Sequence, residues 1–305
     1  MSNLNALNDF LAVKIDDYHE CIDMLEHDFK LDDVIGNIRF HHLKRDGNGR
    51  PMVKALAEML YQYIIDYCIA SKNRPEPLTS RQAAQLTRDA RRLFRHPTIS
   101  TGKPDQTGEA GEALLFFLTE AVLRAPQLVA KMELKTNNRD EVKGSDGIHI
   151  KWNEADNLAE FYFGEAKLYQ DVNAAITSAL KSIDDFHNSE MYKHEFSIIT
   201  KHFKYQNEVV KNEIVNMIKL GEPGPNASIN HTCLIGYDWE RYKSIAPVEL
   251  NKKFQQYLLD DSKNIVEKLN QKFSTFNRKY LKFEIFFLPF PSVSEFRNEF
   301  NAALD

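Results

Sequence analysis

The sequence predicts an α/β fold, with a mixed central sheet flanked by helices and a mostly helical region before it. Residues 145–167 form two β-rich runs around a polar turn, which is a hairpin signal. Apolar residues at helical spacing surround this hairpin, and further alternating runs follow towards the C-terminus. We therefore expect an N-terminal region over 1–100 that contacts a partner or DNA, and a main domain over 101–305.

The composition is typical of a globular protein and gives no general attraction for nucleic acid. The 305 residues are 43% hydrophobic and 27% charged, with a net charge of −5. DNA contacts must therefore come from a local basic patch or through a metal. Three widely spaced cysteines, Cys21, Cys68 and Cys233, suit a reducing cytoplasm and lack zinc-ligand spacing. With no membrane-length apolar run and no secretory signal pattern, we expect a cytoplasmic protein without membrane contact.

In the first hundred residues we expect a short strand at 35–40, a buried helix over 52–70, and a basic helix. The basic helix begins at Thr79 or Ser80 and ends at His96–Pro97. It carries Arg81 and four candidate contacts to the DNA backbone, which are Arg88, Arg91, Arg92 and Arg95. A solvated helix face or an interface with an acidic partner explains these arginines equally well.

After a glycine-containing loop at 102–111, we expect a helix, a first core strand, the hairpin, and then alternating helices and strands. Apolar periodicity and turn signals give their ranges. They are a helix 108–125, a strand 127–136, the hairpin 145–167, a helix 171–187, a helical region 188–222, a strand 231–237, a helix 247–276 with a break at Asp260–Asp261, a strand 280–288 and a closing helix from Ser292. The aromatic residues of the last strand share one face, which is typical of a core rather than of base stacking.

The hairpin places three ionisable residues at the end of an apolar stripe. Because side chains alternate along a strand, Asp146 lies on the apolar face of the first run, and Glu165 and Lys167 lie on that of the second. If Trp152 faces Ala159 across the turn, the apolar faces meet and Asp146 lies opposite Glu165. These like charges repel, and a hard divalent cation would offset them. We therefore predict a magnesium site, or a manganese site, at these two acids.

The order of Asp146 and then Glu165-Ala166-Lys167 resembles the signature of the PD-(D/E)XK nuclease superfamily. In that superfamily the two acids hold a metal ion and the lysine orients or activates the attacking water, so the resemblance implies the same roles here. The expected order of helix, three strands and helix is also that of the nuclease core. The alternative is a surface hairpin with an ordinary Glu–Lys ion pair, because E-X-K triplets are common by chance.

The predicted helix at 108–125 supplies a further acid. On a helical wheel Glu112 borders the apolar stripe, whereas Glu109 lies further round. Nucleases of the superfamily often place an extra acid on this helix, so the resemblance favours Glu112 as a catalytic residue and metal ligand. A first-turn glutamate also interacts favourably with the helix dipole. For Glu112 this interpretation and that of a site residue are about equally supported, and for Glu109 the dipole interpretation is preferred. His149 points to the opposite face from Asp146 in the predicted register.

Three longer motifs give a closer resemblance: G-E-A-G-E-A-L-L-F-F-L at 108–118, K-G-S-D-G-I-H-I at 143–150 and F-G-E-A-K-L-Y at 163–169. Together they resemble the HamA family of the Hachiman bacterial anti-phage system. The resemblance implies a metal-dependent nuclease that degrades DNA with little sequence preference. It also implies a superfamily 2 helicase partner, HamB, that restrains the nuclease until invading DNA is sensed. The site residues that carry over are Glu112, Asp146, Glu165 and Lys167.

Three functions are compatible with the sequence. The preferred one is a magnesium-dependent DNA endonuclease held in check by a helicase. The second is a catalytically inactive nuclease fold kept as a scaffold subunit, although the intact acids and lysine argue against it. The third is a different metal-dependent phosphohydrolase, or a nuclease that acts on RNA. No zinc motif, phosphate-binding glycine loop or Ser–His–Asp pattern supports another chemistry.

Overall fold

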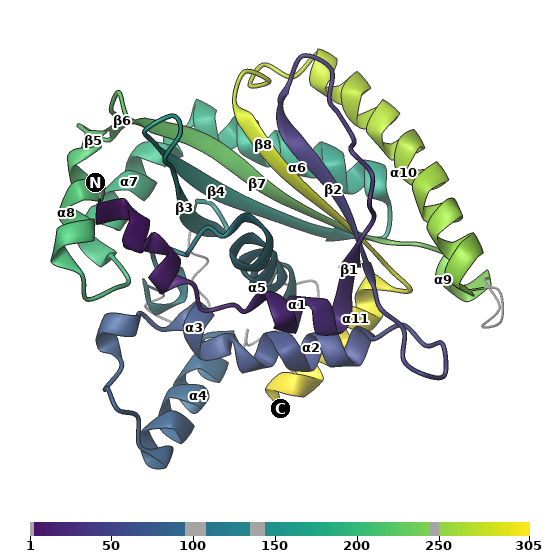
Figure 1. The fold of residues 1–305 in the computed structure, drawn as a ribbon, viewed down its shortest axis with the longest axis horizontal. Coiled ribbons are helices and arrows are strands. Elements are labelled where there is room, and N and C mark those ends of the chain that lie inside the picture. Colours follow the sequence, from purple (N-terminus) through teal and green to yellow (C-terminus); the bar gives the residue numbers. More distant parts are fainter. Residues whose placement is uncertain (1–2, 95–107, 135–143, 245–249) are drawn as a thin grey trace.

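The computed structural model describes residues 3–94, 108–134, 144–244 and 250–305. In these residues the chain forms a curled six-stranded sheet with helices on both faces (Figure 1). The strand order is β1-β2-β8-β7-β4-β3. The strands span Ile22–Met24 (β1), Ile35–Leu43 (β2), Lys282–Phe290 (β8), Ala227–Asp238 (β7), Leu158–Tyr169 (β4) and Gly147–Asn153 (β3). The predicted mixed α/β class is confirmed.

Four central strands, β2, β8, β7 and β4, run parallel, and the outer strands β1 and β3 are antiparallel to their neighbours. Central parallel strands are covered on both faces and therefore read as nearly continuous apolar runs. The last strand, β8, fits this rule, because all its residues after Lys282 are buried. The carboxyl ends of β4, β7 and β8 meet at one edge of the sheet.

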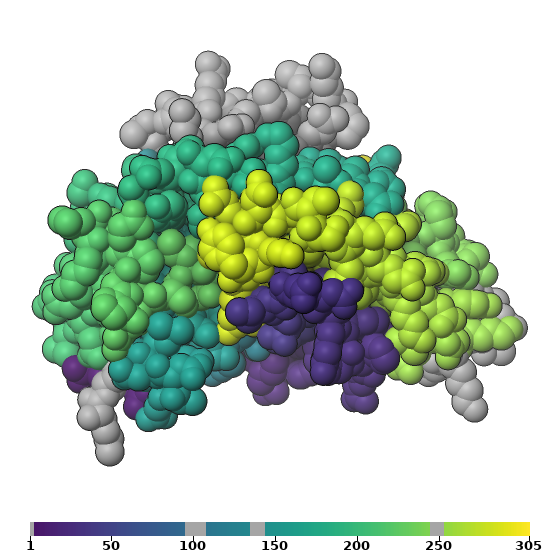
Figure 2. Space-filling view, turned by 90° about the horizontal axis from the view of Figure 1, so that it is seen from above, coloured from purple at the N-terminus to yellow at the C-terminus, as the bar shows by residue number. Residues whose placement is uncertain are grey.

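The first hundred residues contribute strands to this sheet. β2 pairs in parallel with β8, so an N-terminal and a C-terminal segment lie side by side. Figure 2 shows this neighbourhood, with the purple N-terminal part beside the yellow C-terminal part. The strand predicted at 35–40 is confirmed and extends to Leu43. The boundary predicted at residue 100 therefore separates two segments that share one sheet.

Helix α5 (Glu109–Leu118) lies in front of the sheet in Figure 1, and α6 (Val172–Asn188) lies behind it. α5 approaches β4 closely because Gly111 lacks a side chain. A Cβ atom at Gly111 would lie only 3.3 Å from Ala166 Cβ and 3.2 Å from Leu168 Cγ. α6 begins as predicted at Asp171, whose carboxylate accepts a 2.7 Å hydrogen bond from the amide of Ala174. None of the described helices is both long and apolar enough to cross a membrane.

Several predicted helices have different bounds in the structure. The helix expected over 52–70 divides at Tyr63 into α2 and α3, and α10 passes through Asp260–Asp261 without the expected break. The helical region 188–222 contains two helices and a small hairpin. The remaining elements are η1 (Asn3–Phe10), α1 (Ile15–Cys21), α2 (Val53–Gln62), α3 (Ile64–Cys68), η2 (Ser71–Asn73), α4 (Ser80–Phe94), η4 (Thr119–Leu123), η5 (Lys131–Leu134), α7 (Met191–His202), α8 (Glu208–Asn216), β5 (Ile218–Lys219), β6 (Glu222–Pro223), α9 (Arg241–Ser244), α10 (Leu250–Ser274) and α11 (Val293–Leu304).

The first core strand predicted over 127–136 is wrong for residues 127–134, and residues 135 and 136 lie outside the described part of the chain. An isolated bridge joins Gln127 to His149, and the chain then enters the 3-10 helix η5. The three residues before η5 are all buried, so their side chains do not alternate between core and solvent. Lys131 is buried as well, because its ammonium group turns inward to a carboxylate of Glu195, 2.8 Å away. This long-range ion pair stabilises a compact turn in place of the strand.

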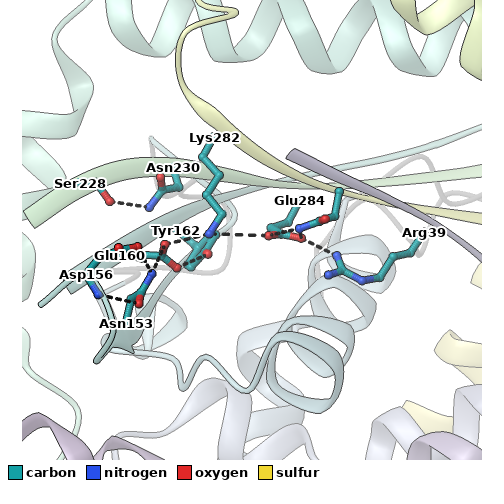
Figure 3. A network of polar contacts seen from close by, with 10 residues as sticks. Arg39, Asn153, Asp156, Glu160, Tyr162, Ser228, Asn230, Lys282 and Glu284 are labelled. Carbon is teal, nitrogen blue, oxygen red and sulfur yellow. Dashed lines mark hydrogen bonds and ion pairs between the residues drawn. The ribbon is translucent and has the colours of Figure 1, made fainter. Parts of the chain in front are cut away.

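A network of paired charges lies near the starts of the parallel strands (Figure 3). Lys282 lies between two acids, with Nζ 2.8 Å from Glu160 and 4.0 Å from Glu284. Arg39 from β2 forms an ion pair with the same Glu284. Because each acid has a basic partner, the network compensates its own charges. It lies near the start of β4, whereas Glu165 lies beyond the middle of that strand.

Candidate active site

The β3–β4 hairpin has the register predicted from the alternation of apolar residues. Trp152 pairs with Ala159 across the turn. Asp146 directly precedes β3, and its amide donates a 2.8 Å hydrogen bond to the carbonyl of Gly164, which is the register partner of Gly147. The chain therefore leaves the regular register at Asp146, which lies beside the segment 164–166 of β4.

A side-chain hydrogen bond fixes Asp146 more closely. Its Oδ2 atom accepts a 2.7 Å hydrogen bond from the backbone amide of Ala166. β3 begins at Gly147, so main-chain pairing with β4 stops before Ala166. The Asp146 carboxylate satisfies the amide left over at this edge, as buried or half-buried amides require. This hydrogen bond ties Asp146 to the segment of β4 that carries Glu165.

Glu165 and Lys167 form an ion pair, with 2.5 Å between Oε1 and Nζ. The two side chains are 13% and 20% exposed, so a ligand can reach the pair from solvent. Burial lowers the pKa of Lys167, but the neighbouring Glu165 and Asp146 carboxylates outweigh this effect and the pKa is raised overall. Lys167 therefore stays cationic at neutral pH.

The acids repel one another. Burial raises the pKa of Asp146 well above its ordinary value, and the carboxylates of Glu165 and Glu112 raise it further. The hydrogen bond from the Ala166 amide and the positive charge of Lys167 lower the pKa of Asp146, but they do not outweigh these effects. The Asp146 carboxyl group is therefore harder to ionise than an ordinary aspartate.

Glu112 reaches the corner from α5. Gly111 lets this helix lie against Ala166, and Glu112 is the next residue along the helix. Its Oε2 atom accepts a 3.0 Å hydrogen bond from the hydroxyl of Tyr67, which belongs to α3. Burial and Glu112 raise the pKa of Tyr67 well above its ordinary value, so the phenol keeps its proton and acts as the donor. The first hundred residues therefore contact this acid directly.

A buried clamp holds the turn that leads into Asp146. The fully buried Glu195 of α7 accepts hydrogen bonds from Lys131 Nζ at 2.8 Å and from the Ser145 amide at 2.7 Å. Lys131 Nζ also donates to the carbonyl of Ser145, at 2.5 Å. Gly144 adopts a φ of +112°, and a Cβ there would lie 2.0 Å from Glu195 Oε1. Only glycine fits this close approach.

The donor set suits a hard divalent cation. Within the described ranges, no three His, Cys, Asp or Glu side chains form a group that could hold a metal ion. Magnesium needs fewer protein ligands than that, since it is usually bound by one or two carboxylates together with water and substrate phosphates. Asp146 and Glu165 provide two carboxylates, and a cation would favour the charged form of Asp146, whose pKa is raised first by burial and then by the neighbouring carboxylates.

Two other ionisable residues considered from the sequence, His149 and Glu109, lie apart from Asp146, Glu165 and Lys167. His149 is buried on the opposite face, as the register predicts, and its Nδ1 lies 2.9 Å from the carbonyl oxygen of Ala125. Glu109 is buried in the first turn of α5, where its Oε2 atom has no hydrogen-bond partner among the described residues. Its place in the first turn is the one that the helix-dipole interpretation requires.

The arginines of α4 divide between two faces. Arg88 and Arg92 are exposed, and with Arg81 they form a stripe, because residues four and seven positions apart share a helix face. Arg91 turns the other way, and its guanidinium donates to the carbonyl of Asp305 at 2.5 Å. Arg95 lies outside the described residues. α4 packs on α3, where the rings of Phe94 and Tyr67 are 5.4 Å apart, and it projects at the lower edge of Figure 1.

Sequence reasoning missed Tyr67, Lys131 and Glu195. Each contacts the site region through a partner at least 14 positions away. Tyr67 falls in an apolar helical pattern that is typical of core residues. Lys131 is a charged residue within an apolar stretch, and Glu195 lies in a segment whose charged residues conceal its burial. A search for charged residues within apolar stretches would have found only Lys131.

Comparison with known proteins identifies the family. A comparison with curated proteins finds no match. The family model described as HamA matches residues 19–304, which is nearly the whole chain and includes the β3–β4 hairpin, α5 and α3. The chain therefore belongs to the HamA family, the family of a component of Hachiman anti-phage defence.

Proposed function

We propose that this chain is a metal-dependent nuclease that hydrolyses phosphodiester bonds in DNA with little sequence preference. The observation that carries the proposal is the meeting of Asp146, Glu165 and Lys167 at the β3–β4 corner. Two acids and one cation in this order are also the signature that resembles the PD-(D/E)XK superfamily. The mixed sheet is compatible with that superfamily.

The proposed roles follow from the contacts. Asp146 and Glu165 would hold a magnesium or manganese ion, with Glu112 as an additional acid. Such an ion would offset the charge that develops on the phosphate oxygens and increase the acidity of the attacking water. Lys167 has three donors, and Glu165 accepts from one of them. The other donors can bind a phosphate oxygen or orient the water.

DNA would approach along the basic face of α4. The exposed stripe of Arg81, Arg88 and Arg92 lies on a helix that packs against α3, and α3 carries Tyr67 to Glu112. Arginines bind phosphates without reading the bases, which fits a nuclease with little sequence preference. Because the chain has a net charge of −5, this local stripe supports DNA binding more than the overall charge does.

We further propose that a superfamily 2 helicase of the HamB type restrains the nuclease. This part of the proposal rests on membership of the HamA family and on the resemblance of its motifs. A restrained nuclease must remain harmless in the cell until invading DNA is sensed. The purified chain should therefore be tested both alone and together with the helicase encoded beside it.

Plasmid cleavage tests the proposal. The wild-type chain should cut supercoiled plasmid with Mg²⁺ and not with a chelator, whereas a Glu165→Ala and Lys167→Ala double variant should not cut. The matched control replaces an exposed Lys–Asp pair on α6, Lys181→Ala with Asp185→Ala, and should cut like the wild type. Undiminished cutting by the site variant would refute the proposed residues. Absence of cutting with and without the helicase would favour a scaffold subunit, and preference for an RNA substrate would favour a ribonuclease.

A further inference from the structure

Tyr67 is the one described residue outside the predicted acids whose side-chain hydroxyl lies close to two of them. The hydroxyl donates to Glu112 Oε2 at 3.0 Å and lies 3.5 Å from the main-chain carbonyl oxygen of Asp146. Glu112 comes from α5 and Asp146 from the start of β3, so this hydroxyl spans two elements of the site. No sequence motif includes Tyr67.

The ring of Tyr67 is fixed, so the position of its hydroxyl is defined. The residue is 3% exposed. Its ring packs between Phe94 of α4 and Phe116 of α5, with centroid distances of 5.4 Å and 5.3 Å. A tyrosine in a packed core usually has a partner for its hydroxyl. Here the partner is a carboxylate of the candidate site, and the resulting bond is charge-assisted and stronger than a neutral one.

We infer that Tyr67 is a positioning residue of the proposed nuclease: its hydroxyl holds the Glu112 carboxylate on the Asp146 side of α5, where the negative charge of Glu112 strengthens the binding of a cation by Asp146 and Glu165. The inference rests on the proposed function. It makes the N-terminal region part of the active site, because α3 supplies the group that orients an acid on α5. Residues that orient metal ligands typically change metal affinity or activity about 10- to 100-fold when they are replaced.

The test measures metal binding by calorimetry, with Mn²⁺ titrated into the full chain. Tyr67→Phe keeps the ring and removes only the hydroxyl, so the fold should persist, as thermal unfolding will show. The matched control is Tyr63→Phe in the same region, whose hydroxyl pairs with Asp17 and not with the site. We expect Tyr67→Phe to weaken Mn²⁺ binding about 10-fold or more, and Tyr63→Phe to bind like the wild type.

A double-mutant cycle separates positioning from general stability. If Tyr67 acts through Glu112, Tyr67→Phe should have no further effect on Mn²⁺ affinity in a Glu112→Gln background. Full additivity in that background, or wild-type affinity of Tyr67→Phe, overturns the inference alone. A wild-type chain that binds no Mn²⁺ and cuts no DNA overturns the proposed function together with the inference.

Discussion

The Asp146 carboxylate accepts a 2.7 Å hydrogen bond from the backbone amide of Ala166, the middle residue of the E-A-K segment. A side chain here replaces the main-chain partner that a longer β3 would provide. The bond keeps the acid beside Glu165 despite their mutual repulsion. The geometry of the candidate site is therefore set where the pairing of two strands ends.

The raised pKa of Asp146 predicts that the acid destabilises the metal-free protein at neutral pH. A carboxyl group with a folded pKa above its unfolded value binds more protons in the folded state. Its effect is absent below the unfolded pKa of about 3.9, and stability is lost as the pH rises towards the folded pKa. We expect Asp146→Asn to raise Tm at pH 7 in chelator, where each kcal/mol corresponds to about 2–4 °C.

With Mg²⁺ the wild type should have a higher Tm than Asp146→Asn, because binding of the ion to the folded state stabilises the wild type and not the variant. Thermal unfolding with and without Mg²⁺ measures both effects. Asp185→Asn on the exposed face of α6 serves as the control and should change neither the Tm in chelator nor the increase in Tm with Mg²⁺. A variant less stable than the wild type in chelator would show that Asp146 is stabilising rather than repelled.

The buried clamp predicts a large loss of stability in Glu195→Gln. The substitution leaves the Lys131 ammonium group buried without a countercharge, which typically costs about 3–5 kcal/mol. Urea unfolding measures the difference. Glu190→Gln is the control, because it removes one partner of an exposed ion pair with Lys193 near the start of the same helix, and should cost less than about 1 kcal/mol. Equal losses in the two variants would contradict the role of the clamp.

The two faces of α4 predict different effects on DNA binding. Arg88→Ala and Arg92→Ala should each reduce the slope of log affinity against log salt by about 1, because each removes one phosphate contact. Arg91→Ala should leave the slope unchanged, since its guanidinium is bound to the Asp305 carbonyl. Fluorescence anisotropy with labelled duplex in chelator, at several salt concentrations, measures the slopes. Equal slopes for all three variants would place the DNA elsewhere.

Local patterns were sufficient to predict the hairpin and its neighbours. A strand alternates with a period of two, so the apolar faces of 145–167 permitted only one register, and β3 and β4 have that register from Gly147 to Asn153. The β8 strand and the start of α6 at Asp171 were predictable for similar local reasons. These elements carry their own signals in consecutive residues.

Features that depend on distant partners could not be predicted in this way. The segment 127–136 resembles a strand until Lys131 is paired with Glu195, which is 64 residues away in the sequence. Tyr67 and Glu112 are separated by 45 residues, and neither shows its partner. The pairing of β2 with β8 joins opposite ends of the chain, which explains why the first hundred residues resembled a separate region.

Crystals of the protein grown with Mn²⁺ would locate the cation by its anomalous scattering. We predict a peak within coordination distance of carboxylate oxygens of both Asp146 and Glu165, and no such peak in crystals of Glu165→Ala. A DNA-cutting protein whose Mn²⁺ peak lies away from these two carboxylates would contradict the assignment of this corner as the active site.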